Sequence, residues 1–264
     1  METNNIFSFR RLVLLCKQSL ILNRKMIVIA LTGFVGVLMI AMFFFQAMSE
    51  FKNWQNRDSE VVFVSLFITL GILYSGLSFP AFRSKEKTMA YLMLPATSSE
   101  KFVFEILTRI IVFILLIPFI FWVVANIEGA LVHNFVPELI NYKFSFVETH
   151  TIKSAPLENE AWITFAIAQG ILFVFIAPFT GASHFSKSPL LKTLFTLTMI
   201  VAGYFIFIYL TFKGLSLNEF DADKNHILFI TNKNNALIAF AIAATILNLC
   251  LITISFFRLK EKEA

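Results

Sequence analysis

Six long stretches of the chain contain no Asp, Glu, Lys or Arg, and they are 18 to 26 residues long. A helix that crosses the hydrocarbon core of a bilayer needs about 20 apolar residues, at ~1.5 Å of rise each. A closed β-barrel would instead show alternating segments of ~10 residues. The pattern therefore predicts an all-α polytopic membrane protein with six spans. The uncharged stretches are 26–49, 61–82, 110–127, 161–186, 193–212 and 234–257.

The composition supports a single transmembrane domain that covers residues 1–264. Hydrophobic residues make up 58% of the chain and charged residues 15%, against about 25% charged in soluble domains. Little sequence remains for a second domain. We expect an N-terminal segment at 5–25, a longer outer segment at 128–160, and six helices. The expected spans are about 26–48, 61–82, 102–127, 161–185, 191–212 and 235–257.

The distribution of Lys and Arg predicts the orientation of the spans. These residues are concentrated in the N-terminal segment, in the connection between spans two and three, and at the C-terminus. Cytoplasmic loops carry an excess of Lys and Arg, so both termini are expected on the cytoplasmic side. The formal net charge of +5 is then a sign of topology rather than of nucleic-acid binding, because no basic patch is interleaved with exposed stacking aromatics.

The segment 5–25 has the pattern of an amphipathic helix. Arg10, Lys17 and Arg24 recur every seven residues, and an apolar row formed by Ile6, Val13 and Leu20 has the same spacing. A helix of this kind, basic on one face, is expected to lie in the inner headgroup region. The alternative is a cytosolic extension of the first span.

The connection between spans two and three carries signals for a helix, a break and a second helix. Ser84 is suited to cap a short helix that ends near Met93, before Pro95. Thr97 and Glu100 have the spacing of a capping box at the start of the next helix. We expect that helix to continue into span three as a cytosolic extension, with Lys101, Glu105 and Arg109 on one face as ion pairs of alternating sign.

The expected spans contain no central charged residue, which disfavours a proton-coupled or ion-coupled transporter. Gln169 and Asn248 are the candidate intramembrane polar contacts, and a hydrogen bond between helices is the favoured role for them. The chain has no Walker A, HExxH or CxxC pattern. We therefore assign no catalytic residue, no metal ligand and no cofactor to this chain, and we do not expect it to be an enzyme.

The motif YLMLPATSSEKF at 91–102, in a basic inner loop between spans two and three, resembles the permease subunits of type-two ABC exporters. In that family a Leu-Pro-x-Ser-type turn and a following Glu-Lys pair open the third helix. The resemblance extends over the whole chain in topology and over about 20 residues in motif. It implies a bacterial inner-membrane protein that exports a substrate, and the apolar, aromatic spans favour a lipid-like or amphipathic one.

The resemblance also implies partners. Two permease subunits, identical or related, would form a dimer, and a separate cytosolic ATPase would hold ATP and Mg²⁺. The inner loop would be the coupling helix that docks on that ATPase. The residues that this implication assigns to the contact or its flanks are Arg83, Lys85, Glu86, Lys87, Tyr91, Leu94 and Pro95, with Glu100 and Lys101 opening the third helix.

Two other function classes remain open from the sequence. A membrane scaffold or sensor would use the outer segment 128–160 to bind a partner, and the inner loop would be dispensable. A channel or facilitator would pass its substrate without any ATPase. The presence of a partner ATPase separates the exporter from both alternatives.

Overall fold

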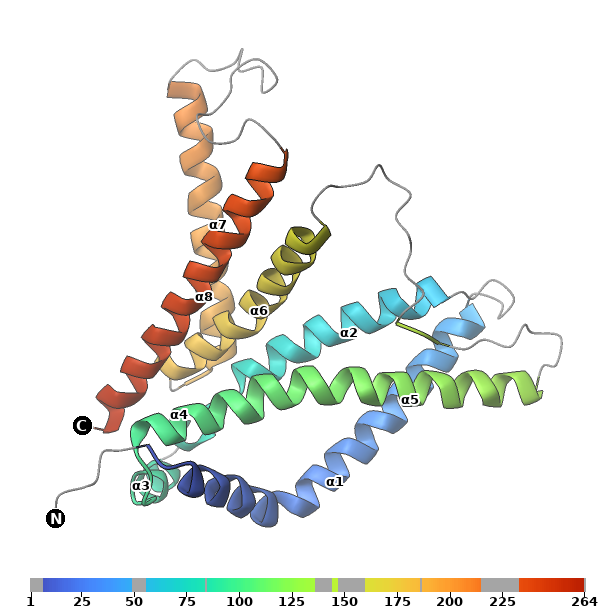
Figure 1. The fold of residues 1–264 in the computed structure, drawn as a ribbon, viewed down its shortest axis with the longest axis horizontal. Helices are drawn as coiled ribbons and strands as arrows, with labels where there is room; N and C mark the ends of the chain where they lie inside the picture. Colours follow the sequence, from blue (N-terminus) through green and yellow to red (C-terminus); the bar gives the residue numbers. More distant parts are fainter. Residues whose placement is uncertain are drawn as a thin grey trace. The chain divides into compact units, whose positions relative to one another are not determined.

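The computed structural model describes residues 7–48, 56–83, 85–135, 144–146, 160–185, 187–214 and 233–263 (Figure 1). In these ranges the chain is almost entirely helical and contains no strand. Six of the helices are long and apolar enough to cross a membrane. The expected all-α fold with six spans is confirmed at this level, and it indicates an integral membrane protein.

The described chain forms two compact units. The first consists of residues 1–71 and 95–154, and the second of residues 72–94 and 155–264. The chain passes from the second unit to the first between Leu94 and Pro95, inside the motif that the sequence singled out. Each unit has its own helix pairs and is described separately.

In the first unit, α1 (Phe9–Met48) packs against α5 (Val112–Phe135). Their contact is largely apolar and includes Leu38, Met42 and Phe121, which are nearly inaccessible. The N-terminal half of α2 (Asn56–Gly76) joins them through contacts between phenylalanine rings. The centres of the Phe63 and Phe121 rings, for example, are 5.0 Å apart. Phe144, from the segment after α5, lies in the same core, and the centre of its ring is 5.2 Å from the centre of the Phe121 ring.

The N-terminal segment is part of one continuous helix. We expected an interfacial helix at 5–25 followed by a span at 26–48, but α1 runs for 40 residues without interruption. Figure 1 shows that this helix changes direction along its length, so that its N-terminal part and its remaining part run differently. The seven-residue basic repeat leaves Arg10, Lys17 and Arg24 exposed. The placement of this part in the headgroup region remains a prediction.

The third span is a single long helical rod. It comprises α4 (Ser98–Ile106), a π-helical turn η2 (Leu107–Ile111) and α5, and its apolar part qualifies as a membrane span. The expected N-terminal extension of this helix before the apolar run is confirmed. The expected end near residue 127 is wrong, because α5 continues to Phe135. The charge at Glu128 ended the uncharged run in the sequence but does not end the helix.

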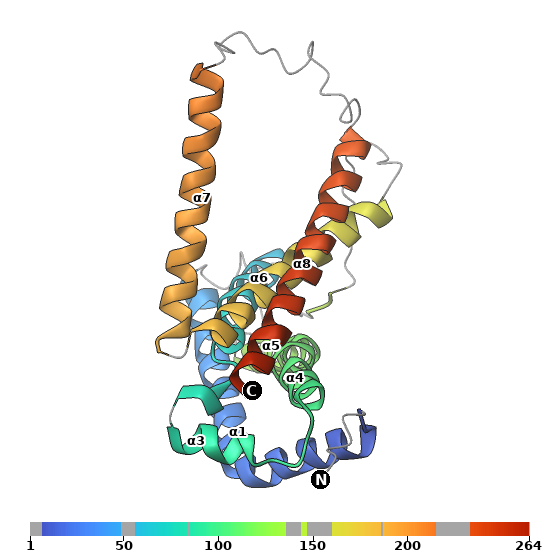
Figure 2. The ribbon, with the colours of Figure 1, turned by 90° about the vertical axis from the view of Figure 1, so that its left-hand side faces the viewer.

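In the second unit, α6 (Glu160–His184) packs along α8 (Lys233–Glu263), and α7 (Pro189–Gly214) packs against α6 (Figure 2). Gln169 and Asn248 meet across α6 and α8, where the Asn248 amide donates to the Gln169 side-chain oxygen at 3.0 Å. Further along, the Ser255 hydroxyl donates to the Thr180 oxygen at 3.0 Å. These polar contacts lie between otherwise apolar helices, which is the role expected for Gln169 and Asn248.

The approach of α6 to α7 depends on Gly181. A Cβ atom at this position would overlap the Thr193 side chain, which is buried and donates its hydroxyl hydrogen to the Pro189 carbonyl at 2.7 Å. Gly170, on the same helix, has open space where a Cβ would stand.

This difference between two glycines gives a paired prediction. We expect Gly181→Ala to lower the free energy of unfolding by about 1–3 kcal/mol, because overpacking forces the helices apart. Gly170→Ala is the matched control and is expected to be neutral or stabilising by up to ~1 kcal/mol, since Ala favours a helix. Thermal unfolding of both variants in detergent measures the effect. Equal behaviour of the two variants would contradict the close α6–α7 contact.

Candidate functional site

The short helix in the connection between the second and third spans is α3 (Lys85–Leu92), and it follows a 3₁₀ turn η1 (Pro80–Arg83). It closes with hydrogen bonds from the Met93 amide to the Met89 carbonyl at 3.1 Å and from the Leu94 amide to the Tyr91 carbonyl at 3.3 Å. The predicted helix before Pro95 is confirmed. Its proposed cap, Ser84, lies outside the described residues.

One side of α3 is held against other residues of the second unit, to which α3 itself belongs. The Thr88 hydroxyl donates to the Ala81 carbonyl at 2.9 Å, and the Tyr91 ring meets the Phe82 ring edge-on at 5.4 Å. The Lys262 ammonium lies 4.9 Å from the centre of the Phe82 ring and donates to the Ser183 carbonyl at 2.6 Å. The helix is thus linked through Phe82 and Lys262 to the ends of α6 and α8.

The other side of α3 is exposed. Met89 and Met93 stand one helical turn apart, with 62% and 83% of their surface accessible. These two residues were missed by the sequence analysis, although their spacing of four positions was visible in it. Three charged residues of the expected ATPase contact are also exposed: Arg83, Lys85 and Glu86.

The remaining residues of that contact occupy different environments. Tyr91 and Leu94 are half-buried, and Pro95 is exposed. Lys87 lies on α3, but its side chain is outside the described part of the structure. Residues 83–94 belong to the second unit, whereas Pro95, Glu100 and Lys101 belong to the first.

Glu100 is the central residue of the start of α4. The predicted capping box is confirmed, since the Thr97 hydroxyl accepts from the Glu100 amide at 3.3 Å and a Glu100 oxygen accepts from the Thr97 amide at 2.9 Å. The other carboxylate oxygen accepts from the Ser8 amide at 2.6 Å and lies 3.1 Å from the Arg11 Nε atom. Glu100 is fully buried. It therefore caps α4 and also binds the start of α1.

The charges after Glu100 lie along the same rod. Arg109 pairs with Glu105 at 3.6 Å, one helical turn earlier, as the spacing predicted. Lys101 and Glu105 are both buried. Glu100 and Lys101 thus lie inside the first unit, and the exposed surface of the connection between the second and third spans is provided by α3.

The structure contains a further buried carboxylate that the sequence analysis did not identify. Glu128 on α5 accepts a hydrogen bond from the Gln46 amide of α1 at 2.5 Å, and both side chains are only 3% exposed. The second Glu128 oxygen has no hydrogen-bond partner among the described residues. Glu128 lies just beyond the expected third span at 102–127, in the part of α5 that continues past the uncharged run, and it was therefore not considered among the residues of the spans.

The connection between the second and third spans combines an anchored helix with exposed apolar side chains. Within the described ranges no group of three or more His, Cys, Asp or Glu side chains is placed to hold a metal ion. The connection presents an anchored helix with two exposed methionines between charged residues. Flexible, polarisable methionine side chains are well suited to docking on another protein.

No protein-family model, no curated protein and no solved structure matches this chain, so its function is argued from its own residues and their geometry.

Proposed function

We propose that this protein is the transmembrane permease subunit of an ATP-binding cassette exporter. A dimer of permease subunits would form the translocation path, and a separate cytosolic ATPase would supply the energy. The six apolar helices and the motif at 91–102 support the proposal. Export of a lipid-like or amphipathic substrate fits the apolar, aromatic character of the spans.

The observation that carries the proposal is the two-sided character of α3. One side is anchored by Thr88 and Tyr91, while Met89 and Met93 are exposed on the other. A docking element that transmits force must be attached to the helices that it moves. The contacts from Tyr91 through Phe82 to Lys262 provide this attachment to α6 and α8.

The capping box gives the start of the third span the same kind of attachment within the first unit. Glu100 ties α4 to Ser8 and Arg11 of the N-terminal region. In our proposal, α3 contacts the ATPase directly, and Glu100 and Lys101 act as positioning residues within the first unit. This assigns different tasks to residues that the resemblance treated as one contact.

The test uses an aspartate on the exposed side of α3. We expect Met89→Asp and Met93→Asp each to weaken binding of the partner ATPase about tenfold, as loss of a central apolar contact does at interfaces. Coupled ATP hydrolysis should fall in parallel. Our proposal expects a cytosolic ATP-binding cassette ATPase to be encoded beside this gene, and the absence of such a gene would count against it. That ATPase is co-expressed and co-purified with the permease, and its binding is measured by titration in nanodiscs.

The matched control is Met48→Asp, an exposed methionine at the last residue of α1, which should leave ATPase binding unchanged. Normal ATPase binding by both α3 variants would refute docking through this helix. Substrate flux in proteoliposomes without any ATPase would favour the channel or facilitator, and loss of function only on replacement of 128–160 would favour the scaffold or sensor.

A further inference from the structure

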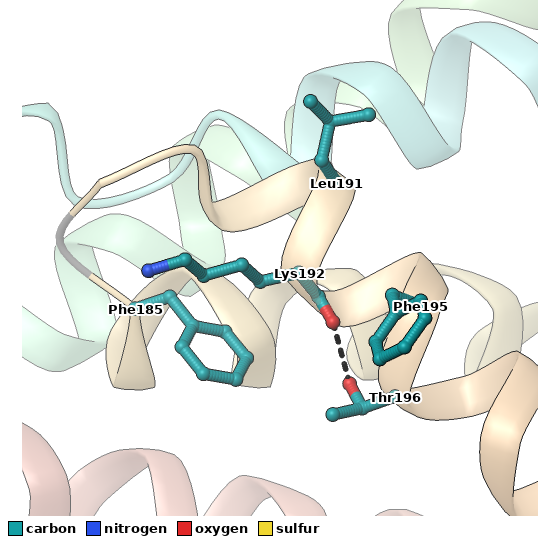
Figure 3. Close-up of a pocket in the computed structure, with 5 residues that line it drawn as sticks. All are labelled: Phe185, Leu191, Lys192, Phe195 and Thr196. Atoms are coloured by element: carbon teal, nitrogen blue, oxygen red, sulfur yellow. Dashed lines mark hydrogen bonds between the residues drawn. The ribbon is translucent and has the colours of Figure 1, made fainter.

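A hollow of about 380 Å³ opens where α6 ends and α7 begins, within the second unit (Figure 3). The hollow is shallow and open to its surroundings. The exposed lining is almost entirely apolar. Leu191 and Phe195, on successive turns of α7, are 71% and 66% accessible. The residues that line the hollow are Phe185, Leu191, Lys192, Phe195 and Thr196.

One cation stands at this apolar hollow. The Lys192 ammonium lies 5.7 Å from the centre of the Phe185 ring, and its aliphatic stem runs along the hollow. The Thr196 hydroxyl donates to the Lys192 carbonyl at 2.8 Å, so this hydroxyl is already satisfied within the helix (Figure 3). The ammonium is therefore the polar group that remains for a ligand.

Among the described residues, the charge of Lys192 is not compensated by a neighbouring carboxylate. The sequence contains no Asp or Glu from 161 to 218. No carboxylate pairs with Lys192 or with the exposed Lys187 among the residues that the structure describes. The hollow thus joins an apolar surface to a local excess of positive charge.

The position of the hollow identifies the medium around it. Lys192 immediately precedes the uncharged run that begins at residue 193, and α7 is apolar enough to cross a membrane. Phe195 and Met199 continue the exposed apolar surface along the helix. At the boundary between charge and hydrocarbon, the molecules that combine an anionic group with an acyl chain are anionic phospholipids.

We propose that this hollow binds an anionic phospholipid. The lipid phosphate pairs with the Lys192 ammonium, and Lys187 adds to the positive potential. The first part of an acyl chain lies on Leu191, Phe195 and the Phe185 ring. This site requires only that the protein is embedded in a bilayer, and it is independent of the proposed ATPase partner.

The experiment uses the full chain in nanodiscs that contain phosphatidylglycerol with a photoreactive acyl chain, diluted in phosphatidylcholine. After illumination, peptide mass spectrometry locates and quantifies the lipid attached to residues 185–196. We expect Lys192→Gln to reduce attachment there about fivefold, the factor given by ~1 kcal/mol for each basic residue at an anionic surface. Lys192→Arg should retain attachment, and Lys85→Gln, on exposed α3, is the matched control.

Several results would overturn the site. Equal attachment of photoreactive phosphatidylcholine would show that charge plays no part. Full competition by soluble glycerol phosphate would show a headgroup site without an acyl chain. Cross-linking of 185–196 to a second copy of the chain would identify a protein interface instead. Because Lys192 is exposed, unchanged circular dichroism of Lys192→Gln is expected and excludes misfolding as the cause of a loss.

Discussion

Replacement of Glu100 by Ala is expected to lower the free energy of unfolding by about 3 kcal/mol, because it removes the acceptor of several buried or half-buried donors. The Ser8 and Thr97 amides would lose their acceptor, and Arg11 would lose its ion pair. For a chain of this size the thermal midpoint should fall by roughly 6–12 °C. The measurement is thermal unfolding in detergent.

A second readout separates the two roles of Glu100. Loss of the Ser8 and Arg11 contacts should release the start of α1, so trypsin should cleave faster after Arg10 and Arg11 in Glu100→Ala. Glu86→Ala is the control, because Glu86 is an exposed residue of α3 and its removal should change stability by at most about 0.5 kcal/mol. Unchanged cleavage at the N-terminus of Glu100→Ala would show that Glu100 acts only as a helix cap.

Replacement of Glu128 by Ala is expected to cost about 3 kcal/mol of unfolding free energy, through a cavity between α1 and α5 and the loss of the Gln46–Glu128 hydrogen bond. The Gln46 and Glu128 side chains are each only 3% exposed, and the surrounding core is apolar. Glu128→Gln keeps the volume and an oxygen that accepts from Gln46. It should therefore remain within about 1 kcal/mol of the original protein.

The comparison of Ala and Gln at position 128 tests the packing of the first unit. Glu261→Ala is the surface control, since Glu261 forms only an exposed pair with Arg258 at 2.6 Å, worth at most about 1 kcal/mol. If Glu128→Ala is as stable as Glu261→Ala, α1 and α5 do not enclose this carboxylate. N-terminal trypsin cleavage should stay unchanged in Glu128→Ala, which distinguishes it from Glu100→Ala.

Local features of the structure were predictable from local sequence. The six uncharged runs predicted six helices that qualify as spans, because the length and hydropathy of a segment decide whether it can cross a bilayer. Thr97 and Glu100 predicted the start of α4, since a capping box involves only four consecutive residues. The spacing of Glu105 and Arg109 likewise predicted their ion pair.

Helix ends were predicted less well where charge was used as the only signal. The third uncharged run stops at residue 127, whereas α5 continues through Glu128 to Phe135. A charged side chain does not interrupt a helix when its partner, here Gln46, lies on a neighbouring helix. The segments 5–25 and 26–48 likewise form one continuous helix, because a change from basic to apolar composition does not break the backbone hydrogen bonds of α1.

The sequence alone thus determined that this chain is a helical membrane protein and that a capped helix begins after Thr97, in the connection between the second and third spans. Only the tertiary structure decided which faces of those helices meet. It joined Glu100 to Ser8, which is 92 positions away, paired Glu128 with Gln46, which is 82 positions away, and set Gly181 against Thr193. The physical reason is that both lipid and helix interfaces are apolar, so hydropathy does not distinguish the face that packs on protein from the face that meets lipid. That choice depends on side-chain shape and on polar partners distant in the sequence.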